Sequence, residues 1–311
     1  MINNVTELIR VQIHSLQAEL KSTSDEKRII EINRLIEENK NILETKYNEL
    51  LKHNGETLGE FEERVSKKPI APKRATGIAL LDNHFDGGFE EGMFINLIGE
   101  SGAGKSTLML EMLMNISAYS KSVFFGFEMS DRITLNKIRH FGITDAHRRN
   151  LVIDIHSRNL ETLKREVLLY AKEGVKFFVI DSKMKLEVEG AMDDHKKISQ
   201  ISSELSKLTQ QNDIIIVLIN QISEENLKTG RVSIKGSGDQ IYDTDIVLVY
   251  RKVKNDPSKR ELQVFKNRQN DKEGVIETKL DGYRTISTKM CEVVEYQVNN
   301  KDNGFLRGLA G

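Results

Sequence analysis

The fold is decided by residues 94–106, which read Phe-Ile-Asn-Leu-Ile-Gly-Glu-Ser-Gly-Ala-Gly-Lys-Ser. An apolar run passes at Gly99 into the pattern G-x-x-x-x-G-K-[ST], and the helical stretch Thr107–Tyr119 follows. Glycines allow backbone N–H groups to turn inward around phosphate oxygens, and the N-terminus of a helix adds positive potential. The pattern therefore predicts a strand–loop–helix unit that binds nucleotide phosphates. The predicted cradle comprises Gly99, Glu100, Ser101, Gly102, Ala103, Gly104, Lys105, Ser106 and Thr107.

Two residues of this loop have distinct expected roles. Lys105 should reach the β- and γ-phosphates, and Ser106 should ligate Mg²⁺. A second apolar run, Phe177–Asp181, ends in a carboxylate, and we expect Asp181 to hold the same Mg²⁺ directly or through water. ATP and Mg²⁺ are therefore the expected cofactors.

Hydrolysis also needs a group that activates or orients the attacking water. Glu128 directly follows the apolar run Val123–Phe127. The carboxyl ends of parallel strands face the ligand crevice, so Glu128 is the predicted catalytic base, with a helix-capping acid as the alternative. Gln221 ends the next candidate run, Ile214–Ile219, where a neutral amide can contact the γ-phosphate and relay its presence to the following loop.

Short apolar runs alternate with helical stretches over residues 76–285. Near-continuous apolar runs indicate strands that are buried on both faces, hence a parallel sheet with helices on each side. Residues 246–250 and 262–265 flank a polar segment that contains Pro257, a pattern typical of an antiparallel hairpin at the sheet edge. Residues 274–283 could add a further strand. The expected fold class is α/β, mostly parallel with antiparallel edge strands.

The composition excludes several classes of protein. The 311 residues include 46 basic and 47 acidic side chains, a net charge of -1, so any nucleic-acid surface must be local. Cys291 is the only cysteine, which excludes an internal disulfide framework and a Cys-rich zinc site. No apolar run approaches 18 residues and no secretory signal is recognisable, so we expect a cytoplasmic protein without a membrane span.

The N-terminal residues 1–52 differ from the rest, because they lack Pro and Gly and repeat apolar residues at helical spacing. Thr23 and Glu26 have the spacing of a capping box, which predicts a second helix there and hence a helical hairpin or broken coiled coil. Its narrow apolar stripe needs a partner, either its hairpin mate, another subunit or another protein. Residues 53–75 are predicted to form a linker with one short helix, and residues 286–311 a polar tail.

Several further motifs show a family resemblance. Phe127-Glu128-Met129-Ser130, Gln221 and Lys266-Asn267-Arg268 occur in an order that resembles the RecA-like ATPase domain of DnaB-type (superfamily 4) hexameric replicative helicases. The resemblance covers residues 74–285, and the hairpin of residues 1–52 stands in place of the usual globular N-terminal domain. It implies a RecA-like fold, a homo-oligomer that is a hexameric ring, and single-stranded DNA as partner. It also implies that Lys266 and Arg268 reach the ATP of a neighbouring subunit as a lysine and an arginine finger.

The segment after Gln221 carries a local positive charge. Lysines and backbone N–H groups of a Gly-containing loop can follow a phosphate backbone without reading bases. Residues 235–238, Lys-Gly-Ser-Gly, resemble the DNA-binding loop of the same family. The predicted DNA contacts are Lys228, Arg231, Lys235, Gly236 and Gly238.

Three functions are compatible with these motifs. The first is an ATP-dependent DNA helicase or translocase of the DnaB-like class. The second is a RadA- or RecA-like recombination or helicase-loading ATPase that remodels DNA without processive unwinding, although a Cys-rich zinc finger like that of RadA cannot form with one cysteine. The third is a nucleotide-switched assembly protein that acts through residues 1–52 and binds no nucleic acid. DNA-stimulated ATPase activity separates the first two from the third.

Overall fold

The computed structural model describes residues 2–51, 55–68, 72–188, 194–221, 243–253 and 256–291. The chain divides into two compact units, residues 1–70 and residues 71–311, and each is described by itself. Within the described residues, every helix is too short or too polar to cross a lipid bilayer.

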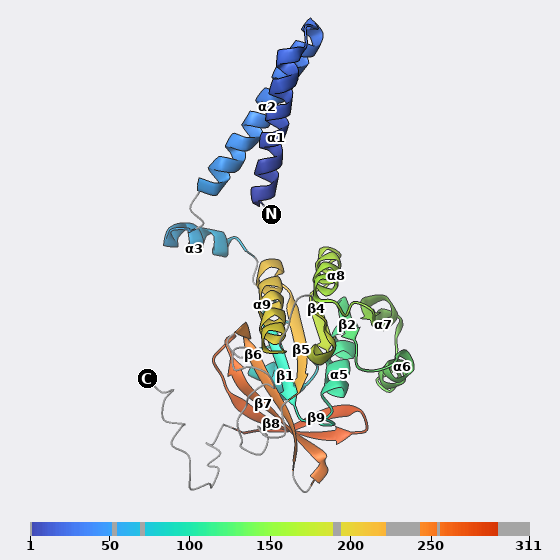
Figure 1. The fold of residues 1–311 in the computed structure, drawn as a ribbon. Coiled ribbons are helices and arrows are strands. Elements are labelled where there is room, and N and C mark those ends of the chain that lie inside the picture. The colour runs from blue at the N-terminus through green and yellow to red at the C-terminus, as the bar shows by residue number, and fades with distance from the viewer. Residues whose placement is uncertain are drawn as a thin grey trace. The chain divides into compact units, whose positions relative to one another are not determined.

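The first unit begins with a helical hairpin of α1 (Ile2–Ser22) and α2 (Glu26–Leu51) (Figure 1). The hairpin mate covers part of the apolar stripe, because Ile13, Ile32 and Ile36 are buried between the two helices. The predicted capping residue is wrong. Asp25 rather than Thr23 caps α2, since its carboxylate accepts the N–H of Lys27 at 3.0 Å and its carbonyl accepts the N–H of Ile29.

A short helix, α3 (Leu58–Ser66), follows in the region predicted to be a linker. Its N-terminus is a capping box, in which the Thr57 hydroxyl accepts the N–H of Glu60 at 3.4 Å. The Glu60 carboxylate in turn accepts the N–H of Thr57 at 2.8 Å. No residue of α3 is buried, so this helix is stabilised by its cap rather than by packing within the described residues.

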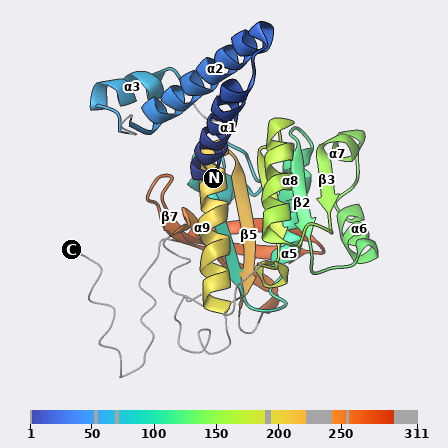
Figure 2. The same ribbon diagram turned by 45° about the horizontal axis from the view of Figure 1, so that its top comes forward.

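The second unit contains, within the described residues, one nine-stranded sheet in the order β3-β2-β4-β5-β1-β6-β7-β8-β9 (Figures 1 and 2). All pairs from β3 to β6 in that order are parallel, and the pairs from β6 to β9 are antiparallel. The predicted fold class is thereby confirmed. The strands are β1 (Phe94–Gly99), β2 (Ser122–Gly126), β3 (Leu151–Asp154), β4 (Phe177–Asp181), β5 (Ile215–Gln221), β6 (Ile246–Val253), β7 (Asp256–Asn267), β8 (Gly274–Asp281) and β9 (Arg284–Cys291).

Helices cover both faces of the parallel part of this sheet. Successive side chains of a strand point to opposite faces, and accordingly Ile95 and Leu97 pack in one core cluster while Phe94 packs in the other. The first cluster includes Leu108 and Met112 of α5, and the second includes residues of α8 and α9. The helices are α4 (Ala79–His84), α5 (Lys105–Ser117), α6 (Asp131–Arg139), α7 (Asp145–Asn150), α8 (Leu160–Lys172) and α9 (Asp194–Asn212), with a 3₁₀ turn at Lys183–Lys185.

The strand order places the phosphate loop between two neighbours. β1 pairs with β5 and with β6, and Gly99 at its carboxyl end lies opposite Gln221 and Tyr250. On the next pair of strands, Gly126 lies opposite Asp181. The carboxyl ends of β1, β2, β4 and β5 therefore meet at the edge of the sheet where open α/β folds bind ligands.

Candidate active site

The loop between β1 and α5 adopts a backbone that glycine makes possible. Gly104 precedes the first residue of α5 with a φ of 101°, a left-handed conformation that L side chains rarely adopt. Gly99 lies so close to β6 that a Cβ added to it would be 2.2 Å from the carbonyl oxygen of Tyr250. Both glycines of the G-x-x-x-x-G-K-[ST] pattern are thus required, one for conformation and one for the close approach of β6.

Lys105 is buried under the loop. Its Nζ donates to the carbonyl oxygens of Gly99 at 3.0 Å and of Glu100 at 2.8 Å. Burial lowers the pKa of Lys105, and the carboxylates of Glu128 and Asp181 oppose this change. The ammonium group therefore lies among negative groups, on the loop where a phosphate would bind.

Asp181, the last residue of β4, is fully buried. Burial raises the pKa of Asp181 to about 6, the Glu128 carboxylate adds to that effect, and the Ser106 hydroxyl acts in the opposite direction. Within the described part of the chain, neither Asp181 oxygen has a hydrogen-bond donor in good geometry. A buried carboxylate without donors is costly unless a cation compensates it.

These residues fit Mg²⁺. This ion prefers oxygen ligands and is typically held by one or two carboxylates together with substrate phosphates. Asp181 supplies a carboxylate with unsatisfied oxygens, and Ser106 supplies a hydroxyl close enough to affect its pKa. Among the described residues, no group of three His, Cys, Asp or Glu side chains could hold a metal alone, so the nucleotide would have to complete the set.

Glu128 stands two residues beyond the end of β2 and is exposed at the same edge of the sheet. Its carboxylate is near enough to influence the pKa values of both Lys105 and Asp181. Glu128 is not the helix cap that was the alternative, because Ser130 occupies the N-cap of α6. Glu128, Lys105, Ser106 and Asp181 are therefore brought together as one site.

Gln221 is the last residue of β5 and lies opposite Gly99, half-buried. The residue before it, Asn220, is fully buried and donates through its side-chain amide to Asn96 of β1. Asn96 donates in turn to the hydroxyl of Thr244, just before β6. This polar chain across the centre of the sheet was missed at the sequence level, although a polar Asn96 within the apolar run Phe94–Ile98 was the signal.

Three more features beside the loop were missed. Arg260 of β7 is buried and donates from Nε to the carbonyl oxygen of Ala103 at 2.9 Å. The backbone N–H of Lys252 donates to the Glu100 carboxylate at 3.0 Å. The Lys252 Nζ lies 3.4 Å from the place where a Cβ on Gly102 would be, so a second cation stands beside the cradle.

Lys266 and Arg268 do not join this site in the same chain. Lys266 and Asn267 of β7 pair with Val247 and Ile246 at the start of β6, whereas the loop adjoins Tyr250. The stretch of β6 from Ile246 to Tyr250 separates the two places by about 13 Å along the strand. Burial lowers the pKa of Lys266 and the Arg268 guanidinium adds to the effect, so the two cations lie close together at the opposite edge.

The predicted DNA contacts Lys228, Arg231, Lys235, Gly236 and Gly238 lie outside the described residues and stay predictions.

Comparisons with known proteins agree with this geometry. The family model described as "ATPase: KaiC" matches residues 74–278. The chain is 23% identical over 205 residues to the DNA repair and recombination protein RadB of Methanobrevibacter smithii, covering 62% of this chain and 87% of RadB. It is 25% identical over 164 residues to the DNA repair protein RadA of Escherichia coli, covering 51% of this chain but only 34% of RadA. The chain thus spans about a third of that relative.

Two solved structures have the same fold. A DnaB-like replicative helicase superimposes with a TM-score of 0.62 at 16% identity, covering 92% of this chain and 78% of the helicase. A KaiC-like protein of the hyperthermophilic archaeon Pyrococcus horikoshii superimposes with a TM-score of 0.58 at 20% identity, covering 70% of this chain and 100% of that protein. At such low identity the likeness concerns the fold, and it confirms the predicted RecA-like architecture.

Proposed function

This chain belongs to the KaiC ATPase family, and from that premise we propose that it is an ATP-hydrolysing DNA translocase of the DnaB-like class. In this proposal ATP binds between copies of the chain, and its hydrolysis moves the chain along single-stranded DNA. The observation that carries the ATPase part is the buried Asp181 carboxylate, whose oxygens have no well-aligned donor among the described residues and which lies near the Ser106 hydroxyl and Lys105. A nucleotide with a divalent cation compensates this charge.

Each residue of the site has one task. Lys105 exchanges the carbonyl oxygens of Gly99 and Glu100 for phosphate oxygens of the nucleotide. Ser106 and Asp181 would hold Mg²⁺, which would supply charge neutralisation for the nucleotide phosphates. Glu128 orients the attacking water and accepts its proton, because it is exposed at the strand edge next to these groups.

Lys266 and Arg268 act on the nucleotide of a neighbouring copy. Two observations support this assignment: both cations lie at the sheet edge opposite their own loop, and the Arg268 side chain is 51% exposed. Arginine fingers contribute about 10³–10⁵ in rate in other phosphoryl-transfer enzymes. The site is therefore incomplete in a single copy, which is the reason for proposing an oligomer, with a hexameric ring as the expected form.

The proposed path to DNA begins at Gln221. Its amide lies opposite Gly99 and directly precedes residues 222–242, the segment with the predicted DNA contacts Lys228, Arg231 and Lys235. Loss of the γ-phosphate would be sensed by Gln221 and passed to that segment. The polar chain from Asn220 through Asn96 ties the same strand end to the start of β6.

A mixing experiment tests the shared site. Lys105→Ala removes the phosphate contact of a copy, and Arg268→Ala removes its finger, so each variant alone should be nearly inactive while the Arg268→Ala variant still binds ATP. If fingers act between copies, random mixing joins an intact loop to an intact finger at about a quarter of the interfaces, and ATPase activity returns. A mixture that stays inactive, or an Arg268→Ala variant with normal hydrolysis, contradicts the assignment.

A second candidate function is a RadA- or RadB-like ATPase that remodels DNA without processive unwinding. It is favoured by the curated relatives, whose names refer to DNA repair and recombination. Stimulation of ATP hydrolysis by single-stranded DNA is expected for both candidates and not for a nucleotide-switched assembly protein. Displacement of a strand from a forked duplex is expected for the translocase alone.

A further inference from the structure

The start of β6 contains a carboxylate that the proposed mechanism does not use. Asp245 is buried and is fixed against β1 by two hydrogen bonds. Its backbone N–H donates to the carbonyl oxygen of Phe94 at 2.9 Å, and its carboxylate accepts the N–H of Phe94 at 2.9 Å. The position of this carboxylate is therefore set by the central strand of the sheet.

The same residue contacts Arg268 twice. The Asp245 carbonyl oxygen accepts the backbone N–H of Arg268 at 3.0 Å, and the Asp245 carboxylate accepts Nη1 of the guanidinium at 3.3 Å. The carboxylate side chain is 11% exposed and the arginine side chain 51%. A buried, immobilised acceptor thus holds one end of a half-exposed guanidinium.

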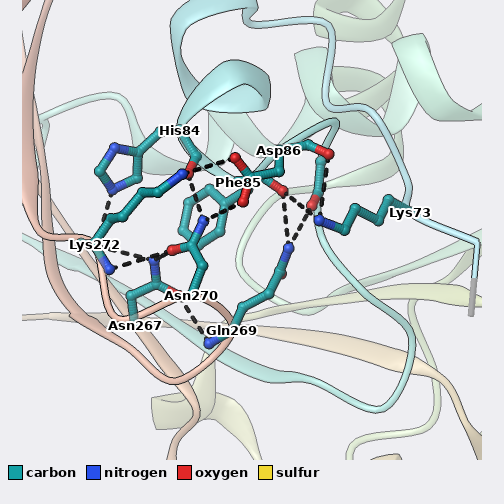
Figure 3. A network of polar contacts seen from close by, with 9 residues as sticks. Lys73, His84, Phe85, Asp86, Asn267, Gln269, Asn270 and Lys272 are labelled. Atoms are coloured by element: carbon teal, nitrogen blue, oxygen red, sulfur yellow. Dashed lines mark hydrogen bonds and ion pairs between the residues drawn. The ribbon is translucent and has the colours of Figure 1, made fainter.

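The residues that flank Arg268 in the sequence are held by a network of polar contacts, several of them with the end of α4 (Figure 3). Gln269 donates from Nε2 to the carbonyl oxygen of Phe85 at 2.9 Å, and Asn270 donates to that of His84 at 2.8 Å. Asn267 is buried and donates to the carbonyl oxygen of Lys272 at 2.9 Å. With its neighbours on both sides fixed, Arg268 can vary mainly in the direction of its side chain.

We propose that Asp245 is the positioning residue of Arg268, whose guanidinium it aims toward a nucleotide bound by another copy of the chain. The inference rests on the proposed function, since it assumes that Arg268 acts on that nucleotide. A guanidinium presents several donors in a rigid plane, so one donor can stay on Asp245 while others meet phosphate oxygens. An arginine whose side chain is not held in the productive orientation lowers the rate of the reaction, and a misplacement of about 1 Å can lower that rate about 10²-fold.

Asp245→Asn tests the proposal. The amide oxygen can still accept the N–H of Phe94, but the negative charge that holds the guanidinium is gone. We expect kcat for ATP hydrolysis to fall about 10- to 100-fold with KM changed little, because orientation rather than binding is lost. In the Arg268→Ala background, Asp245→Asn should cause no further loss, since the residue acts through the arginine.

Asp145→Asn is the matched control. Asp145 also pairs with an arginine, Arg148 at 2.9 Å, but this pair is exposed on α7 and lies outside the network that holds the neighbours of Arg268. It should leave kcat unchanged. Asp245→Glu keeps the charge and should retain more activity than Asp245→Asn at an equal folded fraction, measured by thermal unfolding.

The outcomes separate the two proposals. If Arg268→Ala hydrolyses ATP normally, the finger and hence the proposed shared site fail. If Arg268→Ala is inactive while Asp245→Asn hydrolyses ATP normally, only the positioning role fails. The same holds if Asp245→Asn lowers kcat by the same factor in the presence of Arg268 and in the Arg268→Ala background. If Asp245→Glu is no more active than Asp245→Asn at the same folded fraction, charge is not what Asp245 contributes, and the proposal also fails.

Discussion

Replacing Asp181 with asparagine should stabilise the nucleotide-free protein while abolishing its activity. The pKa of Asp181 is raised from the ordinary 3.8 to about 6 in the folded protein, chiefly by burial. The folded chain therefore binds this proton more tightly than the unfolded chain does. The resulting stability is fully present below the unfolded pKa of 3.8 and is lost as the pH rises through about 6.

The size of the effect follows from these two pKa values. At about 1.36 kcal/mol for each pH unit, the difference between 3.8 and about 6 amounts to about 3 kcal/mol of stability lost at pH 7.5. Asparagine removes the charge, but its buried amide needs hydrogen-bond partners. Where they are missing, the unpaired amide lowers the free energy of unfolding by about 1–3 kcal/mol. We expect a net gain of about 0–2 kcal/mol, or up to roughly 8 °C in Tm for a domain of this size.

Thermal unfolding in EDTA, without nucleotide, measures this gain at pH 7.5 and at pH 5. The gain should be smaller at pH 5 by about 1.4 kcal/mol, because the ionisation penalty of Asp181 is roughly halved there while the cost of the buried amide is unchanged. Asp154→Asn is the control, because Asp154 also ends a strand but its carboxylate accepts the N–H groups of His156 at 2.8 Å and Ser157 at 3.0 Å. That variant should be less stable than the wild type at both pH values.

Bound nucleotide should favour the wild type over Asp181→Asn. Added ATP and Mg²⁺ should raise the Tm of the wild type more than that of Asp181→Asn, because only the wild type has the carboxylate that holds the ion. The reasoning is refuted if Asp181→Asn is less stable than the wild type at pH 7.5 in EDTA, or if its gain is as large at pH 5 as at pH 7.5.

Three further perturbations probe the same loop. Glu128→Gln should keep ATP binding, measured by calorimetry, and lower kcat by about 10²–10⁴, since a general base is lost; normal turnover would remove Glu128 from that role. Lys252→Ala should weaken ATP binding about two- to fivefold, because the exposed ammonium beside Gly102 is screened by water; an unchanged Kd would show that it does not contact the nucleotide. Gly99→Ala should lower the free energy of unfolding by about 1–3 kcal/mol or more, since its Cβ would be 2.2 Å from the Tyr250 carbonyl oxygen. Denaturant titration measures this change, and an unchanged free energy of unfolding would contradict the close approach.

Much of the site could be predicted from local patterns. Gly99, Lys105 and Ser106 belong to one short motif, and Asp181 and Glu128 stand at or just beyond the ends of apolar runs. Parallel strands bring their carboxyl ends to one edge of the sheet, so residues at those positions converge whatever the strand order is. The same reasoning could not reach Arg260, because it lies on β7, an antiparallel strand whose register against the loop is set by pairing over long distances in the chain. Lys252 lies on β6, which is parallel to β1 but continues beyond the expected run 246–250, so only the structure places it beside the loop.

The sequence by itself determined the phosphate loop, the buried parallel strands and the helical hairpin, because each depends on periodicity, glycine conformation or capping within a few neighbouring residues. Even there, only the structure identifies Asp25 as the residue that caps α2, since Thr23 offers an equally suitable side chain two residues away. Only the tertiary structure decided that Arg268 lies at the sheet edge opposite its own loop and against Asp245. That placement depends on the hydrogen-bond register between β6 and β7 and on contacts with Phe94, about 150 residues from Asp245 in the chain, and no local pattern encodes such pairing.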